Sequence, residues 1–397
     1  MTKILLYGVV PENNLGGPSL MHGAREIIKE VNQNYEIVFY QSSKPVDTFI
    51  NDMEFPVYQI PYERSFELLK DAFKYKVGIR PNREDRYKFL EDIKSSDIVA
   101  NLYGICFCSN LGKIEKTKFE YIKAIMSSIG QFSISFVAKT FGVKSVKCTA
   151  SYGPIVSKKD IVSARFSSRH IFDVIVAREV ESKNQIEKAC KRNITVSPDL
   201  ANLMPYSNAK TNCKTIGISV SHQIIRQWKS DENYIDCMVK LIEHIQTSTY
   251  YKVILIPNEF TIGPYHDIYV AEEIMSLLKN KNNVEILDVA NISSSELKNH
   301  IAACDVMIAS RYHSCVAALS AGVPTLIIGW HHKYDELLKW YGQSQWILSS
   351  ENCTSNELIA MFDKFWSKKD ENRNIIKKHY IDVRKALIDA GKDMFSV

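Results

Sequence analysis

The sequence lacks any apolar run of the ~18 to 20 residues that a membrane-spanning helix needs. It also lacks internal repeats and low-complexity tracts. A strong charge of one sign is missing as well, because 50 basic residues stand against 45 acidic ones and leave a net charge of +5. Such a mild excess does not argue for nucleic-acid binding. We therefore expect no nucleic-acid partner and, at most, peripheral contact with a membrane.

Paired cysteines are missing too. The nine cysteines are scattered without a Cys-x-x-Cys pair, which predicts reduced thiols in a cytoplasmic protein. Cys106 and Cys108 have no second pair, so we interpret them as packing residues.

His331 and His332 are adjacent and their side chains point apart, so no metal ion is predicted. The opening MTKILLYG has too short an apolar part for a signal peptide and is interpreted as the first core strand.

Strand and helix signals alternate in two blocks of the 397-residue chain, whose 45% hydrophobic content is ample for full cores. The alternation predicts parallel sheets covered by helices. The predicted fold is therefore α/β, with two doubly wound Rossmann-like domains facing a cleft. The expected strands are residues 3–9, 36–40, 97–102, 145–151 and 173–177 in the first block, and 215–220, 252–257, 284–288, 306–309 and 325–329 in the second.

A polar, unpatterned stretch at residues 203–214 separates the blocks and predicts a hinge. We expect an N-terminal domain at residues 1–204, a C-terminal domain at 215–375, and a terminal helix at 376–397 that crosses back to the first domain. Residues 113–142 are rich in apolar side chains and are interpreted as one or two core helices. Contact of this segment with a lipid-linked molecule remains the alternative.

Residues 305–332 hold the most informative pattern, a strand, turn, helix and strand with ionisable side chains at the turns. Arg311 and His313 fall in the first turn of the predicted helix. His332 and Lys333 lie just beyond the second strand. In open parallel sheets, ligands bind at the carboxyl ends of the strands, so these side chains are candidate site residues.

The residue types in this pattern suit an anionic substrate. A helix amino terminus attracts anions, Arg311 offers a planar fork that matches a carboxylate or phosphate, and Lys333 offers a point charge. His313 can move a proton near neutral pH. The combination predicts proton transfer on an anionic substrate. A surface arginine and a structural histidine remain the alternative reading.

The segment Ser310-Arg311-Tyr312-His313, followed by AALSAGVPTLIIG, resembles the C-terminal signature of the polysaccharide pyruvyl transferases. These enzymes move a pyruvyl group from phosphoenolpyruvate onto a sugar. Residues 176–179 with Ser182, and residues 197–200, resemble two further segments of that family. The resemblance is strongest over residues 172–338, and it implies two doubly wound domains of the glycosyltransferase-B type.

The amino terminus departs from the family pattern. Relatives open with a strand and a Gly/Asn-rich turn that often carries an Asp, whereas here no carboxylate directly follows Gly16. If relatives use that Asp to bind or activate the acceptor sugar, this chain must use another group. Asn14, Ser19 and Glu12 are the candidates.

The resemblance implies an enzyme that uses phosphoenolpyruvate as donor and needs no cofactor. The acceptor would be a sugar of a cell-surface polysaccharide or of its lipid-linked precursor, and the products a ketal and phosphate. His313 is the catalytic candidate, acting as acid or base. The donor-binding candidates are Arg311, Lys333, Ser310, Arg178 and Arg165, and the further cleft candidates are Asn14, Gly16, Gly17, His222, Asn258, Glu259 and His332.

Two other functions remain open at this point. A glycosyltransferase of the same two-domain plan would bind a nucleotide sugar, with Glu336 placed to hold a ribose. A catalytically inactive protein would bind an anionic glycan. The sequence leaves the acceptor sugar, the hydroxyl pair, the ketal stereochemistry and the oligomeric state undetermined.

Overall fold

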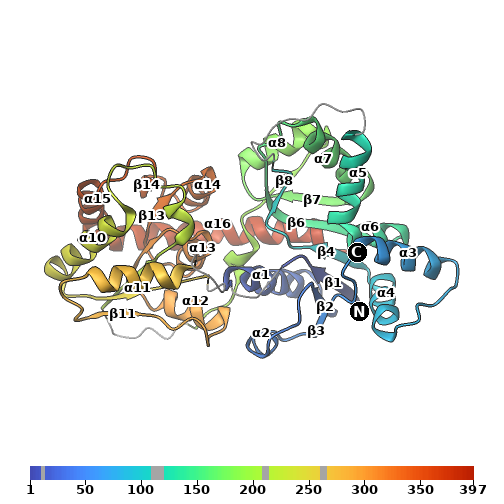
Figure 1. The fold of residues 1–397 in the computed structure, drawn as a ribbon, viewed down its shortest axis with the longest axis horizontal. Coiled ribbons are helices and arrows are strands. Elements are labelled where there is room, and N and C mark those ends of the chain that lie inside the picture. The colour runs from blue at the N-terminus through green and yellow to red at the C-terminus, as the bar shows by residue number, and fades with distance from the viewer. Residues whose placement is uncertain (10–13, 109–119, 208–213, 260–265) are drawn as a thin grey trace. The chain divides into compact units, whose positions relative to one another are not determined.

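A computed structural model describes residues 1–9, 14–108, 120–207, 214–259 and 266–397. The chain divides into two compact units. The first comprises Met1–Val10, Ala24–Asp199 and Ala386–Val397, and the second comprises Pro11–Gly23 and Leu200–Lys385. The helices α1 (Gly16–Val31) and α16 (Lys369–Phe395) therefore contribute residues to both units (Figure 1).

The first unit is built on a parallel sheet with the strand order β3-β2-β1-β4-β6-β7-β8, and β5 pairs with β6. All five strands predicted for this block are present. The sequence did not predict β3, β5 and β8, because strands of two or three residues are too short to show a periodicity. The strands are β1 (Thr2–Tyr7), β2 (Tyr35–Gln41), β3 (Val57–Gln59), β4 (Ile98–Asn101), β5 (Ile105–Cys106), β6 (Lys144–Tyr152), β7 (Val174–Ala177) and β8 (Thr195–Val196).

Helices cover this sheet through two apolar clusters. One cluster joins α3, α4 and α6 to the central strands, and the other joins α7 and α8 to β6 and β7. The sequence predicted one or two helices over residues 113–142; residues 120–140 form two, while 109–119 lie outside the described residues. The helices are α2 (Asp47–Asp52), α3 (Ser65–Lys76), α4 (Glu84–Ser95), α5 (Glu120–Gln131), α6 (Ser133–Thr140), α7 (Lys158–His170) and α8 (Val180–Cys190).

The second unit has a parallel sheet with the order β11-β10-β9-β12-β13-β14. Its strands are β9 (Thr215–Ser219), β10 (Lys252–Leu255), β11 (Val284–Ile286), β12 (Val306–Ala309), β13 (Thr325–Gly329) and β14 (Ile347–Ser349). Its further helices are η1 (Leu200–Leu203), α9 (His222–Ile225), α10 (Tyr234–Ser248), α11 (Asp267–Leu277), α12 (Ser294–Ala302), α13 (Tyr312–Ser320), α14 (His332–Trp340) and α15 (Ser355–Ser367).

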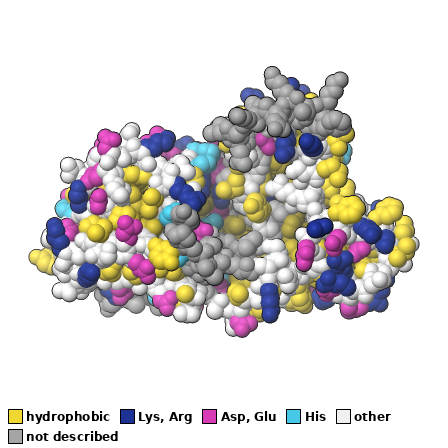
Figure 2. Space-filling view, viewed as in Figure 1, with side chains coloured by type: hydrophobic (Ala, Val, Ile, Leu, Met, Phe, Trp, Pro, Cys, Tyr) yellow, Lys and Arg dark blue, Asp and Glu magenta, His cyan; other side chains and the backbone are white. Residues whose placement is uncertain are grey.

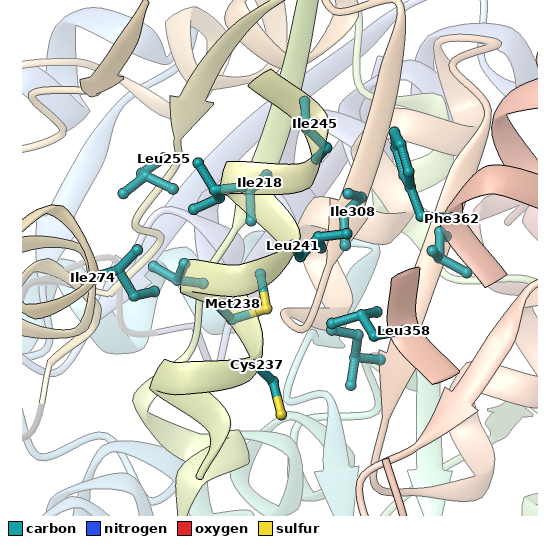
Figure 3. Packing of buried hydrophobic residues seen from close by; sticks show 14 of the residues in the cluster. Ile218, Cys237, Met238, Leu241, Ile245, Leu255, Ile274, Ile308, Leu358 and Phe362 are labelled. Atoms are coloured by element: carbon teal, nitrogen blue, oxygen red, sulfur yellow. The ribbon is translucent and has the colours of Figure 1, made fainter. Parts of the chain in front are cut away.

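The core of the second unit follows from the helical spacing of apolar residues in α10. Met238, Leu241 and Ile245 recur three or four residues apart, so they share one face of the helix. This face packs on the strand residues Ile218 and Ile308, as Figure 3 shows. Burial of this apolar cluster stabilises the sheet of the second unit.

The strand order reverses between β1 and β4 in the first unit and between β9 and β12 in the second. At such a switch point the loops after neighbouring strands diverge and leave a crevice, where ligands bind. The unit boundaries also differ from the predicted ones, because residues 11–23 group with the second unit. The predicted hinge at 203–214 lies partly outside the described residues. No helix of the described chain is long and apolar enough to cross a bilayer.

Candidate functional site

A buried carboxylate ties together the loops at the carboxyl edge of the second sheet. Asp267 is the first residue of α11 and is fully buried. Its oxygens accept hydrogen bonds from the backbone N–H groups of His222 (2.9 Å), Asn258 (3.1 Å) and Glu259 (3.0 Å). They also accept from the Arg311 side chain, from Nε at 2.8 Å and from Nη2 at 2.5 Å. One side chain thus fixes the segments that follow β9, β10 and β12.

Arg311 is the N-cap residue of α13 and is largely buried. Its Nε and Nη2 edge is held by both oxygens of Asp267, and Nη2 also lies 2.6 Å from Oε2 of Glu259. Burial alone would lower the pKa of Arg311, but the two carboxylates raise it, so the guanidinium stays charged. The sequence predicted a fork open to an anionic ligand. Protein carboxylates instead occupy this fork. Of the three guanidinium nitrogens of Arg311, only Nη1 has no hydrogen-bond partner among the described residues.

His313 lies against the glycine turn from the amino terminus of the chain. A Cβ atom added to Gly16 would come within 2.4 Å of Nδ1 of His313, so only glycine fits there without displacing the imidazole. The Gly16 N–H donates to Oδ1 of Asn14 at 2.8 Å, and helix α1 begins at this residue. The amino termini of α1 and α13 therefore meet at His313.

The turn itself is anchored on the second sheet. The Leu15 N–H donates to the Asn258 carbonyl at 3.2 Å, and Asn14 forms an isolated antiparallel bridge with Glu259. The Leu15 side chain packs in an apolar cluster with Ile256 and its neighbours. The sequence placed this turn in the N-terminal, acceptor-side domain. The structure corrects that, because these contacts put Asn14 and Gly16 beside His313. Glu12 lies outside the described residues.

Lys333 lies in the first turn of α14, whose N-cap is His331. Its Nζ is 5.2 Å from the ring centroid of Tyr312, 5.0 Å from that of Trp330 and 5.4 Å from that of Tyr334. Distances within about 6 Å allow cation–π attraction, which orients the ammonium group. Because Tyr312 is the first residue of α13, Lys333 brings a second positive charge to the amino terminus of that helix.

Ser310 and Asn258 are buried and hold neighbouring segments of the site together by hydrogen bonds. Ser310 is buried, and its carbonyl accepts from the Tyr334 hydroxyl at 2.9 Å. The Asn258 amide donates to the Ser314 hydroxyl at 3.0 Å, which also accepts from Ser219 at 2.8 Å.

The two other histidine candidates are His222 and His332. Burial and the nearby Arg226 lower the pKa of His222, which favours the neutral form of its imidazole. In the part of the chain described, Nε2 of His332 is buried without a hydrogen-bond partner.

The two arginines predicted from the first unit have partners of their own there. Arg178 is 3% exposed and donates to Glu179 (2.8 Å), Asp199 (2.6 Å) and Ser151 (2.5 Å). Burial would raise the pKa of Glu179, but the Arg178 charge and two serine hydrogen bonds hold it below its usual value. Nε of Arg165 donates to the Ala189 carbonyl on α8 at 3.1 Å. Arg178 thus belongs to a buried ion pair, and Arg165 links α7 to α8.

A cavity of about 440 Å³ lies at the switch point of the first sheet, where β1 and β4 end. Its shape depends on Gly8, which has a φ of +95° and would place a Cβ 2.7 Å from the Asn101 amide. Glu63 is the single charged residue among the described residues that line it. The other polar and aromatic lining residues are Tyr7, Ser42, Tyr62, Ser65, Asn101, Tyr103, Gln131, Phe132 and Ser133.

Sequence reasoning did not identify Asp267 or Ser314. An Asp at the start of a helix is common for helix stability alone, so its spacing gave no sign of a role. Ser314 follows His313 directly, yet a serine within a helix is unremarkable. Among the described residues, no group of three His, Cys, Asp or Glu side chains could hold a metal ion.

Solved structures similar to this chain share its two-unit fold. The UDP-GlcNAc 2-epimerase of Neisseria meningitidis, bound to UDP-GlcNAc, matches over 100% of both chains with 12% identity and a TM-score of 0.56. A glycosyltransferase from Rickettsia africae ESF-5 matches over 99% of this chain and 97% of its own, with 11% identity and a TM-score of 0.55. Spinosyn rhamnosyltransferase matches over 99% and 100%, with 9% identity and a TM-score of 0.53. The predicted glycosyltransferase-B type fold is thereby confirmed.

Comparison with curated protein sequences gives no match. A family model does match, and it covers residues 14–332, from the glycine turn to the first residue of α14. The matched span includes Gly16, Asp267, Arg311 and His313, which the fold brings together, although they are far apart in sequence. This chain belongs to the polysaccharide pyruvyl transferase family and is a transferase.

Proposed function

We propose that this enzyme transfers the pyruvyl group of phosphoenolpyruvate to two hydroxyls of one sugar. The sugar belongs to a cell-surface polysaccharide or to its lipid-linked precursor, and the products are a cyclic ketal and phosphate. The observation that carries the proposal is the meeting of two helix amino termini at His313, between Arg311 and the segment that holds Gly16. The eight described cysteines are all free thiols, which suits work in the cytoplasm.

The charges around Arg311 determine how an anionic donor would bind. Arg311 and Lys333 carry two positive charges, and Asp267 and Glu259 carry two negative ones, so the side chains alone do not attract an anion. The N–H groups and dipoles at the starts of α1 and α13 supply the remaining attraction. Glu259 is about one-third exposed, whereas Asp267 is fully buried. We infer that the donor displaces Glu259 from Arg311 and leaves Asp267 in place.

The reaction needs three proton movements. Protonation of the methylene carbon of phosphoenolpyruvate makes C2 electrophilic, and a sugar hydroxyl adds to C2 as it loses its proton. A neighbouring hydroxyl then bonds to C2 as the bond between C2 and the phosphate oxygen breaks, and its proton leaves with the phosphate, which closes the ketal and releases hydrogen phosphate. His313 handles one of these protons, as acid toward the methylene or as base toward the hydroxyl, because an imidazole titrates near neutral pH.

The cavity of the first unit suits a sugar acceptor. Aromatic rings stack on the apolar faces of a pyranose, and amide and hydroxyl groups hydrogen-bond to its hydroxyls. Tyr62, Tyr103 and Phe132 supply the rings, while Asn101 and Gln131 supply amides. Glu63 is the one carboxylate among the described lining residues, and we assign it to bind a pair of adjacent hydroxyls. None of the described residues that line the cavity is cationic, so we infer a neutral sugar.

The test measures phosphate release from phosphoenolpyruvate with galactose, glucose and N-acetylmannosamine derivatives as acceptors. His313→Ala should bind the donor normally and lose turnover by about 10²-fold or more, the scale of one positioned proton-transfer group. His300→Ala, an exposed histidine on α12, is the matched control and should keep wild-type turnover. Equal turnover of the two variants would remove His313 from the mechanism. Thermal stabilisation by a nucleotide sugar, and not by phosphoenolpyruvate, would favour a glycosyltransferase instead.

A further inference from the structure

Helix α3 of the first unit exposes large apolar side chains that a folded protein normally covers. Phe66 is 72% exposed, Phe73 is 71% and Val77 is 62%, and Ile79 just beyond the helix is 55%. Single exposed apolar residues are normal, but a contiguous group of them marks an interaction surface. These residues lie within 14 positions of the sequence and come from one helix and its end.

The spacing shows that these side chains form one face. Phe66, Lys70, Phe73 and Val77 follow each other at intervals of three or four residues, which places them along one side of α3. Leu68, on another side of the helix, is buried in the core of the unit. The neighbouring helix α5 also has exposed apolar residues, which are Tyr121, Ile122 and Met126.

Basic residues are interleaved with the apolar ones. Between residues 64 and 80 there are five basic and two acidic side chains. Both acidic ones, Glu67 and Asp71, are paired with Arg86. Arg64 and Lys70 make no ion pair within the described chain. The neighbouring Lys74 makes none either. Figure 2 shows hydrophobic and basic side chains gathered together in the region where Figure 1 places α3. The net charge of this face is therefore positive.

We propose that this surface, formed by Phe66, Lys70, Phe73, Lys74, Val77 and Ile79 and called the α3 face, binds the surface of an anionic lipid bilayer. A helix of this composition lies in the plane of the interface, with its apolar side chains below the headgroups. The lysines extend toward the lipid phosphates, and each contributes electrostatic attraction. A second protein chain fits less well, because the centres of protein interfaces are depleted in lysine.

The α3 face adjoins the cavity of the same unit. Ser65 and Leu68 line the cavity, and Phe66 lies between them in sequence but faces solvent. A bilayer bound at the α3 face would thus lie beside the cavity. If the cavity binds the acceptor, as proposed above, a sugar still attached to its membrane lipid reaches it without leaving the membrane. This last step rests on the proposed function, but binding of the bilayer does not.

The experiment is co-sedimentation of the full-length protein with vesicles, without donor or acceptor. Vesicles of equal parts phosphatidylglycerol and phosphatidylcholine should bind the wild type, and pure phosphatidylcholine should bind it much more weakly. Phe66→Ser/Phe73→Ser should weaken binding at least tenfold, because two aromatic rings no longer insert. Lys70→Glu/Lys74→Glu should weaken it by about fivefold or more for each lysine lost. Tyr250→Ser/Ile381→Ser removes exposed apolar groups from the second unit and should bind as the wild type does.

Binding of the phenylalanine variant at wild-type strength would overturn the proposal, as would no preference for anionic vesicles. Sedimentation velocity tests the rival partner. Self-association of the wild type that disappears in Phe66→Ser/Phe73→Ser would assign the α3 face to a second copy of the chain instead. Phosphate release with a water-soluble sugar acceptor should stay at wild-type levels in this variant. Failure of that reaction in the wild type itself would count against the proposed function and leave bilayer binding unaffected.

Discussion

Replacing Asp267 with Asn should loosen the second unit and the site together. The side chain keeps its shape, but it loses its charge and one of its two acceptor oxygens. The amide NH2 group then faces N–H donors, and the Arg311 guanidinium loses its buried partner. Removing one partner of a buried ion pair costs about 3 to 5 kcal/mol, because the other charge remains buried. We expect the free energy of unfolding to fall by about this amount.

Glu259→Gln is the matched control, because Glu259 contacts the same guanidinium nitrogen from a partly exposed position. Exposed ion pairs contribute about 0 to 1 kcal/mol, so this variant should be nearly as stable as the wild type. If the donor displaces Glu259, the variant should also bind phosphoenolpyruvate at least as tightly as the wild type. Asp267→Asn should bind it more weakly, since Arg311 is no longer held in place.

The assay is chemical denaturation followed by tryptophan fluorescence. All five tryptophans, Trp228, Trp330, Trp340, Trp346 and Trp366, belong to the second unit, so the signal reports on that unit alone. Isothermal titration with phosphoenolpyruvate measures the affinity of each variant for the donor. An Asp267→Asn protein that unfolds within about 1 kcal/mol of the Glu259→Gln protein would refute the reasoning, because the two carboxylates would then be equivalent.

Three further predictions concern the second unit. Gly16→Ala should lower turnover by about tenfold or more without unfolding the chain, because the added Cβ would displace His313. Gly104→Ala is the control, since the nearest atom to its added Cβ is 3.9 Å away. Equal turnover of the two variants would show that the glycine turn has no part in catalysis. Arg311→Lys should weaken phosphoenolpyruvate binding by roughly one to two powers of ten, since a lysine cannot hold Asp267 and a ligand together; unchanged affinity in isothermal titration would count against Arg311 as a donor contact. Burial lowers the pKa of Lys298 to about 7, well below the roughly 10.4 of a lysine in the unfolded chain. Between these two pH values the unfolded chain therefore binds more protons than the folded chain. The free energy of unfolding should therefore rise from pH 7 toward pH 10 by roughly 4 kcal/mol relative to Lys298→Met, and parallel stability curves for the two proteins would contradict this.

The regular elements of this chain could be predicted from local sequence. Residues 306–309 are apolar and bounded by polar residues, and they form β12. The small residues that follow form α13, which ends just before Gly322, a residue with a φ of +76°. Periodicity and turn residues act over a few positions, so they can be read without knowledge of the fold. The same local reading placed Arg311 and His313 at the start of α13.

The strands that the sequence did not predict show the limit of local sequence patterns. β14 (Ile347–Ser349) has three residues and is added beside β13, where pairing along its whole length defines it. Such a strand owes its conformation to its neighbour rather than to its own composition. The first unit shows the same limit, because the predicted Arg178 has its guanidinium buried among carboxylates that come from positions up to 21 residues away.

The sequence by itself determined the alternating strands and helices, the family signature and the presence of an arginine and a histidine at one helix start. Tertiary structure decided what surrounds them. Arg311 faces Asp267, 44 residues earlier, and Gly16 from the opening of the chain lies against His313. Contacts between distant residues depend on how whole sheets and helices pack. No local pattern encodes them, so the partners of each charge became visible only when the chain was folded.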